Sequence, residues 1–197
     1  MTRQEHIEES RRISAKFGPL LKSTELGKIG PLKGYEWSPT TVLNEYGESW
    51  WVANVGSMKA YVKGRVQVKK PDKPVYESFS IRYIREPMNH VPEEWDKLTK
   101  LVKFLDGADP RGSSAQLYYA QVWIDERDTL LTAAVVRLQN LFHLPEDAWS
   151  SRPVNEKGSA WFRFVSFDHP LLAGYVWQSA DLVTVDSSIG ASALGAL

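Results

Sequence analysis

The chain has 197 residues, with 24 Lys and Arg against 24 Asp and Glu, and no Cys. Its length fits one domain, and the lack of Cys excludes disulfides, thiolate nucleophiles and Cys-ligated metal centres. Hydrophobic residues make up 43% of the chain, enough for a folded core. No apolar run reaches the roughly 18 residues of a membrane-spanning helix, and the N-terminus has no apolar signal core. We therefore expect no membrane contact and no secretion signal, and a protein that is cytoplasmic in the producing cell or part of a virion.

Three segments of the chain have ordinary helix patterns. Residues 2–16 have a narrow apolar stripe, so this helix is expected to pack lightly on its own domain or to contact another subunit. A short helix is expected over residues 38–46, where Ser precedes Pro at the start and Gly follows the end. A longer helix is expected to open at residue 92 and to end at residue 107.

The widest apolar face belongs to residues 128–143. Leu131, Val135, Leu138 and Phe142 are spaced at i, i+4, i+7 and i+11, which is one stripe of a helix. The sequence therefore predicts that the best helix of the chain packs here against one face of a sheet.

Alternating or short apolar runs predict strands over residues 50–55, 58–70, 75–85, 117–124, 160–167 and 175–185. The two prolines within residues 71–74 are typical of a turn that joins two strands as a hairpin. Strands grouped in this way, with helices on one side, predict the α+β class: a mainly antiparallel sheet of about six strands with two to four helices. Because no linker divides the sequence, residues 1–197 are expected to form a single domain.

The expected hairpin over residues 58–85 is a basic ribbon. Alternate residues from Met58 are core-like, and the residues between them are charged or polar. The candidate binding residues on this expected outer face are Lys59, Tyr61, Lys63, Arg65, Lys69 and Arg82. Three interpretations stay open: a face that meets only solvent, a contact with an acidic protein surface, or a contact with nucleic-acid phosphates in which Tyr61 or Tyr76 stacks on a base.

No catalytic or metal-binding motif stands in the sequence. The four His residues are far apart, and neither a G-x-S-x-G elbow nor a glycine-rich phosphate loop occurs. We therefore expect no metal site and no cofactor. Asp168 and His169, followed by Pro170, form the most enzyme-like local group, although Asp and Pro also favour an ordinary turn.

The C-terminal residues 187–197 are small, uncharged and mildly apolar, and residues 164–197 contain three Asp but no Lys or Arg. A positive ribbon and a negative end can attract a second copy of the chain. The leading hypothesis is therefore a non-catalytic assembly protein that forms a homo-oligomer or a larger particle, such as a viral or phage structural component. In it, residues 2–16 and 187–197 extend the domain as subunit contacts. The alternative is a single-stranded nucleic-acid-binding protein that uses the ribbon. A third hypothesis is an enzyme whose site is not visible as a motif.

Overall fold

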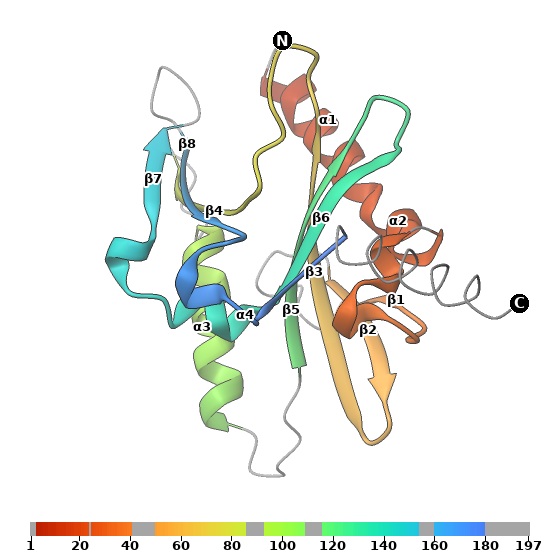
Figure 1. Ribbon diagram of the computed structural model, residues 1–197, viewed down its shortest axis with the longest axis vertical. Helices are drawn as coiled ribbons and strands as arrows, with labels where there is room; N and C mark the ends of the chain where they lie inside the picture. Colours follow the sequence, from red (N-terminus) through yellow and green to blue (C-terminus); the bar gives the residue numbers. More distant parts are fainter. Residues whose placement is uncertain are drawn as a thin grey trace, which may run out of the picture.

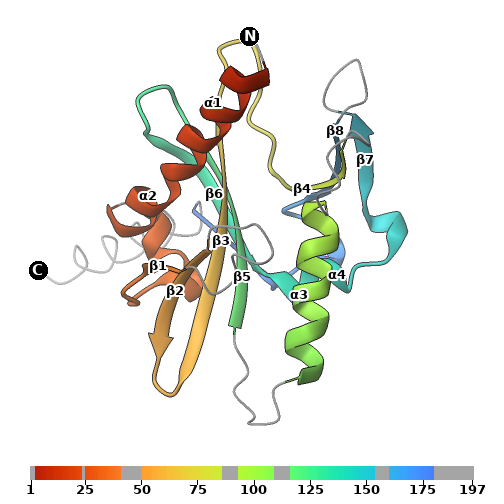
Figure 2. The same ribbon diagram turned by 180° about the vertical axis from the view of Figure 1, so that it is seen from behind.

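The computed structural model describes residues 3–23, 25–40, 50–85, 93–108, 116–153 and 160–179 and confirms the expected α+β class. The chain forms three layers, which are visible in Figures 1 and 2. A six-stranded sheet lies in the middle, and the N-terminal helices cover one of its faces. Two further helices and a three-stranded sheet, which was not expected, cover the other face.

The central sheet has the strand order β1-β2-β3-β5-β6-β9. Its strands are β1 (Ser38–Thr40), β2 (Trp50–Val55), β3 (Met58–Val68), β5 (Gln116–Ile124), β6 (Leu130–Arg137) and β9 (Val176–Gln178). Neighbouring strands are antiparallel except for β3 and β5, which run parallel. The sheet is therefore mixed and mainly antiparallel, and β3 and β5 lie in its interior.

The helices α1 (Arg3–Ala15) and α2 (Phe17–Ser23) cover one face of the central sheet. α1 is largely exposed, as its narrow apolar stripe predicts, whereas α2 is anchored by the buried ring of Phe17. Gly64 in β3 makes this close approach possible, because a Cβ atom there would overlap the Phe17 ring. Two short 3-10 turns, η1 (Glu25–Lys28) and η2 (Gly30–Leu32), complete this layer.

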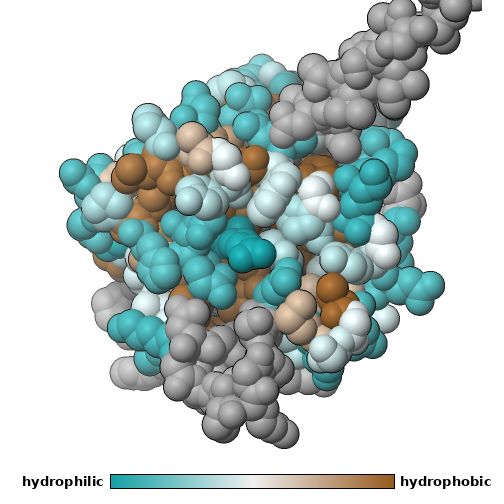
Figure 3. All heavy atoms as spheres, turned by 60° about the horizontal axis from the view of Figure 1, so that its bottom comes forward, coloured by the Kyte–Doolittle hydropathy of each residue, from teal (hydrophilic) through white to brown (hydrophobic). Residues whose placement is uncertain are grey.

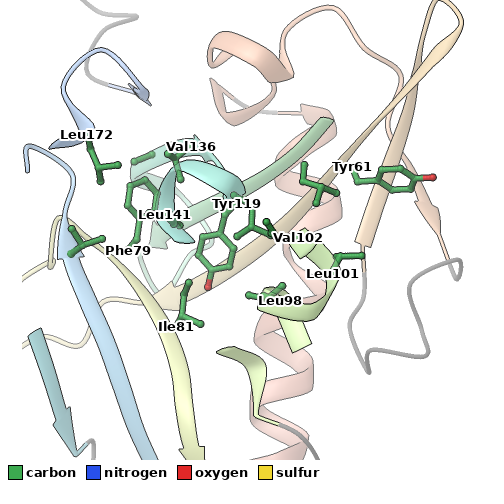
Figure 4. Close-up of a cluster of buried hydrophobic side chains, with 14 of the residues drawn as sticks. Tyr61, Phe79, Ile81, Leu98, Leu101, Val102, Tyr119, Val136, Leu141 and Leu172 are labelled. Atoms are coloured by element: carbon green, nitrogen blue, oxygen red, sulfur yellow. The ribbon is translucent and has the colours of Figure 1, made fainter. Parts of the chain in front are cut away.

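The opposite face is covered by α3 (Glu94–Ala108), α4 (Leu138–Phe142) and the three-stranded sheet. That sheet is antiparallel in the order β4-β8-β7, formed by β4 (Ser78–Arg85), β8 (Ala160–Ser166) and β7 (Ser150–Pro153). Figure 4 shows the core between the layers, where side chains such as Ile81, Leu98 and Tyr119 point toward one another from β4, α3 and β5.

The helix expected over residues 128–143 is wrong. Residues Leu130–Arg137 form β6, and only Leu138–Phe142 are helical. β6 is covered on both faces, so its consecutive apolar residues are all buried: Ala133, Ala134, Val135 and Val136. Over so short a stretch, a continuous apolar run also satisfies a helical stripe, which is why the pattern was ambiguous.

The hairpin expected over residues 58–85 is also wrong. β3 pairs with β2 on one side and with β5 on the other, so it has no free edge for β4. β4 pairs with β8 in the smaller sheet, and residues 69–77 cross from one sheet to the other (Figure 1). The prolines in this segment therefore mark a crossing between sheets and not a tight turn within one.

Smaller differences concern segment ends. Residues Ser38–Thr40 form β1 where a helix was expected, because they pair with β2; residues 41–46 lie outside the described part of the chain. Residues Ser150–Pro153 form β7, which was not among the expected strands. The expected strand 175–185 includes β9 but is described only as far as Ser179, and the tail 187–197 lies outside the described residues.

The described surface is mixed in character. Figure 3, which views the molecule from the bottom of Figure 1, shows hydrophobic residues in small patches among hydrophilic ones. The large hydrophobic side chains that are exposed are Ile7, Tyr76, Ile84, Leu131, Leu171 and Tyr175. Among the helices of the described ranges, none is long and apolar enough to cross a membrane.

Candidate functional site

β4 lies at an edge of the smaller sheet, and side chains of β5 hydrogen-bond its backbone. The backbone N–H of Ser80 donates to Oε1 of Gln121 (3.3 Å), and its C=O accepts from the hydroxyl of Tyr119 (2.9 Å). The Ser80 hydroxyl also donates to Gln121 Oε1 (3.0 Å). Gln121 is fully buried, so these bonds satisfy polar groups away from water and hold the smaller sheet against the central one.

Glu94, the first residue of α3, also hydrogen-bonds the backbone of β4 and joins it to side chains of β3. Its Oε2 accepts from the backbone N–H of Arg82 (3.1 Å) and from Nη1 of Arg65 (3.2 Å), and its Oε1 pairs with the ammonium group of Lys63. Lys63 is only 6% exposed and Glu94 only 9%. These four residues, Lys63, Arg65, Arg82 and Glu94, are referred to below as the Glu94 cluster.

The charges in the Glu94 cluster determine its ionisation. Burial alone raises the pKa of Glu94, but the charges of Lys63 and Arg65 and the hydrogen bonds from Lys63 and the Arg82 N–H outweigh it and lower the pKa to about 2. Glu94 is therefore an anion at neutral pH. The carboxylate contacts two cationic side chains, those of Lys63 and Arg65, and the backbone N–H of Arg82, so positive charge exceeds negative charge in the cluster.

Two arginines of the smaller sheet, one of which belongs to the Glu94 cluster, flank a phenylalanine on one face of that sheet. Arg82 in β4 and Arg152 in β7 are the register partners of Phe162 in β8, so the three side chains share one face of the sheet. The guanidinium of Arg65 lies 4.4 Å from the centroid of the Phe162 ring, and that of Arg82 lies 5.4 Å from it. Arg152 lies 4.4 Å from the centroid of Phe164. These five residues are referred to below as the arginine–phenylalanine face.

Tyr76 borders this face from the crossing segment 69–77. The Arg152 guanidinium lies 5.1 Å from the centroid of its ring, so Arg152 contacts both Tyr76 and Phe164. The backbone C=O of Tyr76 accepts from the indole N–H of Trp123 (3.0 Å), which fixes the crossing segment to β5. An exposed aromatic ring is thus held next to an exposed arginine.

Arg163 lies on the opposite face of β8 and has a different environment. Its guanidinium lies 4.2 Å from the centroid of Trp95 and 5.1 Å from that of Tyr83. Two of its nitrogens donate to the carboxylate of Glu146, at 2.9 Å and 2.6 Å. In contrast, no carboxylate of the described residues pairs with Arg152.

Two of the candidate residues are not exposed as expected. Tyr61 belongs to the core between the two sheets, where burial also raises the pKa of its phenol. Lys63 is buried against Glu94. The reason is that α3 and the smaller sheet cover the face of β3 that the hairpin interpretation had placed in solvent. The expected exposed ribbon is therefore wrong.

The other candidates divide between the site and its surroundings. Arg65 and Arg82 are brought together over Phe162, although from different sheets and not from one hairpin. Lys59 is exposed near the start of β3, and Lys69 follows the end of β3, where it donates to the C=O of Lys70 (3.4 Å). The structure thus brings two of the candidate cations onto the arginine–phenylalanine face, whereas neither of these two lysines has a described contact with its five residues.

Asp168 and His169 form the turn that their residue types favour. The N–H of His169 donates to the C=O of Ser166 (3.3 Å), its Nδ1 accepts from the N–H of Leu171 (3.3 Å), and Asp168 accepts from the Ser166 hydroxyl. All of these contacts are local. Within the described ranges, no group of three or more His, Asp or Glu side chains lies close enough together to hold a metal ion.

Sequence reasoning missed Arg152, Phe162, Phe164 and Glu94. The two phenylalanines lie two residues apart in a predicted strand, and this spacing already indicates a shared face. Arg152 gave no such signal, because no strand was expected over its segment. Glu94 lies near the start of the helix expected from residue 92, where acidic residues are common whatever their partners, so it gave no signal of its own.

Comparison of the chain with protein-family models, with curated proteins and with solved structures found no match.

Proposed function

We propose that this protein binds single-stranded nucleic acid with its arginine–phenylalanine face. The observation that carries the proposal is the convergence of Arg65, Arg82 and Arg152 on two adjacent phenylalanine rings. Among the described residues, Arg152 in particular is exposed and has no paired carboxylate.

Guanidinium groups that are stacked on aromatic rings suit phosphate binding. The ring fixes the plane of the guanidinium without consuming its N–H donors, which stay directed outward along that plane. Phe162 and Phe164 therefore support the arginines, and the arginines contact the ligand. The affinity of such a surface for nucleic acid falls steeply with added salt, because phosphate contacts release counterions.

The test uses fluorescence anisotropy with a labelled single-stranded oligonucleotide. Arg152→Gln removes an exposed charge and should leave the fold intact, and we expect it to weaken binding by about tenfold, equivalent to about 1.4 kcal/mol. The dependence of log affinity on log salt concentration should also become shallower by roughly 0.7, the value for loss of one contact to a single strand.

The matched control is Lys59→Gln, which removes one exposed positive charge near the start of β3, outside the arginine–phenylalanine face. It should change affinity by less than about twofold, because an isolated exposed charge outside the face contributes only through long-range attraction. No binding by the wild-type protein, or equal losses in the two variants, would overturn the proposal.

A second candidate function is self-assembly into a homo-oligomer or a larger particle such as a virion. The observation that favours it is the pair Leu171 and Tyr175, each 54% exposed in the segment that leads into the edge strand β9. Exposed apolar side chains beside a strand edge are suited to contact with another copy of the chain. We propose a cytoplasmic or virion location with either function.

The oligomer is tested by measuring mass in solution with light scattering over a range of concentrations. The double variant Leu171→Ser, Tyr175→Ser should shift the protein toward the monomer, and Ile7→Ser on α1 is the control for loss of an exposed apolar residue. A wild-type protein that stays monomeric at high concentration contradicts this second candidate.

A further inference from the structure

We infer that Tyr76 stacks on an unpaired base while Arg152 contacts the adjoining phosphate, so that the site selects single strands over duplexes. This inference rests on the proposed function and names the part of the face that recognises the base. The sequence left Tyr61 and Tyr76 as alternatives for this role. The structure removes Tyr61, which is buried in the core, and leaves Tyr76 40% exposed.

Tyr76 is held in place from behind. Its backbone C=O accepts from the indole N–H of Trp123 (3.0 Å) and from the N–H of Ser78 (2.8 Å). Its ring centroid lies 6.1 Å from that of Trp123, with the planes inclined at 47°. A ring fixed in this way loses little conformational freedom on binding, which favours its use as a stacking platform.

Tyr76 is also placed beside a cation. Arg152 lies over the Tyr76 ring, 5.1 Å from its centroid, and is exposed, so a base that covers the exposed part of the ring comes within reach of the guanidinium. Tyr175 is comparably exposed, but no cation of the described residues lies over its ring. An exposed ring together with an adjacent positive charge matches one nucleotide: a flat base and the phosphate that follows it.

The pairing of these two groups accounts for selection of single strands. In a duplex, each base is stacked between its neighbours and presents only an edge, whereas a single strand can turn one base onto a protein ring. The arginines by themselves bind phosphates of either form. Tyr76 is therefore the residue that distinguishes single strands from duplexes.

The test compares a single-stranded oligonucleotide with the duplex of the same sequence by fluorescence anisotropy. Tyr76→Leu removes the flat ring but keeps an apolar side chain at an exposed position. It should weaken binding of the single strand by about tenfold, the range seen for loss of one stacked base, and change duplex binding by less than about twofold. Tyr76→Phe keeps the ring and should bind like the wild type. Ile7→Ser on α1 is the control for loss of an exposed apolar side chain elsewhere.

A second readout detects stacking directly. A single 2-aminopurine in the oligonucleotide should lose fluorescence when it binds to the wild type and to Tyr76→Phe, and should keep it with Tyr76→Leu. If Arg152→Gln weakens binding but Tyr76→Leu leaves affinity and quenching unchanged, or weakens single strand and duplex equally, the stacking role is wrong and the proposed function stands. If the wild type binds neither ligand, both fail.

Discussion

The two faces of the three-stranded sheet use the same pairing of arginine with aromatic rings but differ in what neutralises the charge. On one face Arg152 lies 4.4 Å from the centroid of Phe164, and on the other Arg163 lies 4.2 Å from that of Trp95. Arg163 donates two hydrogen bonds to Glu146, whereas no carboxylate of the described chain pairs with Arg152. A stacked arginine by itself therefore indicates no function. The presence or absence of a counter-charge separates a closed structural contact from a surface open to an anion.

The carboxylates on the two faces also differ in burial. The Glu94 side chain is 11% exposed and is shared by Lys63 and Arg65, whereas the Glu146 side chain is 79% exposed. Burial makes the first contact costly to break, and solvent weakens the second. This difference can be measured with paired substitutions on the two faces.

The largest expected effect is the loss of stability on removing Glu94. Glu94→Ala removes the carboxylate that pairs with the buried ammonium of Lys63 and should lower the free energy of unfolding by about 3–5 kcal/mol. Glu146→Ala should lower it by less than about 1 kcal/mol, because its carboxylate is exposed. Urea unfolding of both variants measures the difference. If Glu94→Ala does not fold, Glu94→Gln replaces it; the Gln side chain still accepts a hydrogen bond, so its loss of stability should be smaller than that of Glu94→Ala. Equal losses for substitutions of Glu94 and Glu146 would show that burial does not separate the two contacts.

The pH dependence of stability should also reflect the burial of Glu94. The pKa of Glu94 is lowered from 4.5 to about 2 on folding, so its ionised form stabilises the folded state above pH 4.5, and this contribution is lost as pH falls from about 4.5 to about 2. The advantage in unfolding free energy of the wild type over Glu94→Gln should therefore shrink by roughly 3 kcal/mol between pH 6 and pH 2. Urea unfolding at several pH values tests this. Parallel curves for the two proteins would show that the pKa of Glu94 is not lowered on folding.

A smaller effect separates Arg163 from Arg152. Arg163→Ala removes the paired hydrogen bonds to Glu146 and the contact with Trp95, and should lower the free energy of unfolding by about 1–2 kcal/mol. Arg152→Ala should lower it by less than about 1 kcal/mol, because Arg152 is exposed and unpaired among the described residues. The order should reverse for oligonucleotide affinity, which Arg152→Ala weakens and Arg163→Ala leaves nearly unchanged. Unfolding and anisotropy measured on the same samples test both expectations. A variant that changes stability and affinity together would show that the two arginines do not divide these roles.

Local patterns predicted well where one pattern applied. Residues 50–55 were expected to form a strand and form β2, and the helix expected from residue 92 to 107 corresponds to α3. The pattern failed over residues 128–143, where consecutive apolar residues fit both a helix and a doubly buried strand. Only the pairing of β6 with β5 and β9 decides between these two, and that pairing involves residues distant in the sequence.

For the candidate site, the sequence determined which residues share a face, since side chains alternate along a strand whatever surrounds it. Tyr61, Lys63 and Arg65 do lie on one face of β3, as do Phe162 and Phe164 on β8. Only the tertiary structure decided which face is covered. The parallel pairing of β3 with β5 excludes the hairpin and sends β4 into the second sheet, which buries Lys63 and brings Arg65, Arg82 and Arg152 together. The alternation of side chains is set by the backbone geometry within each strand. Which face becomes buried depends on contacts between strands that are distant in the sequence, and no local pattern predicts these contacts.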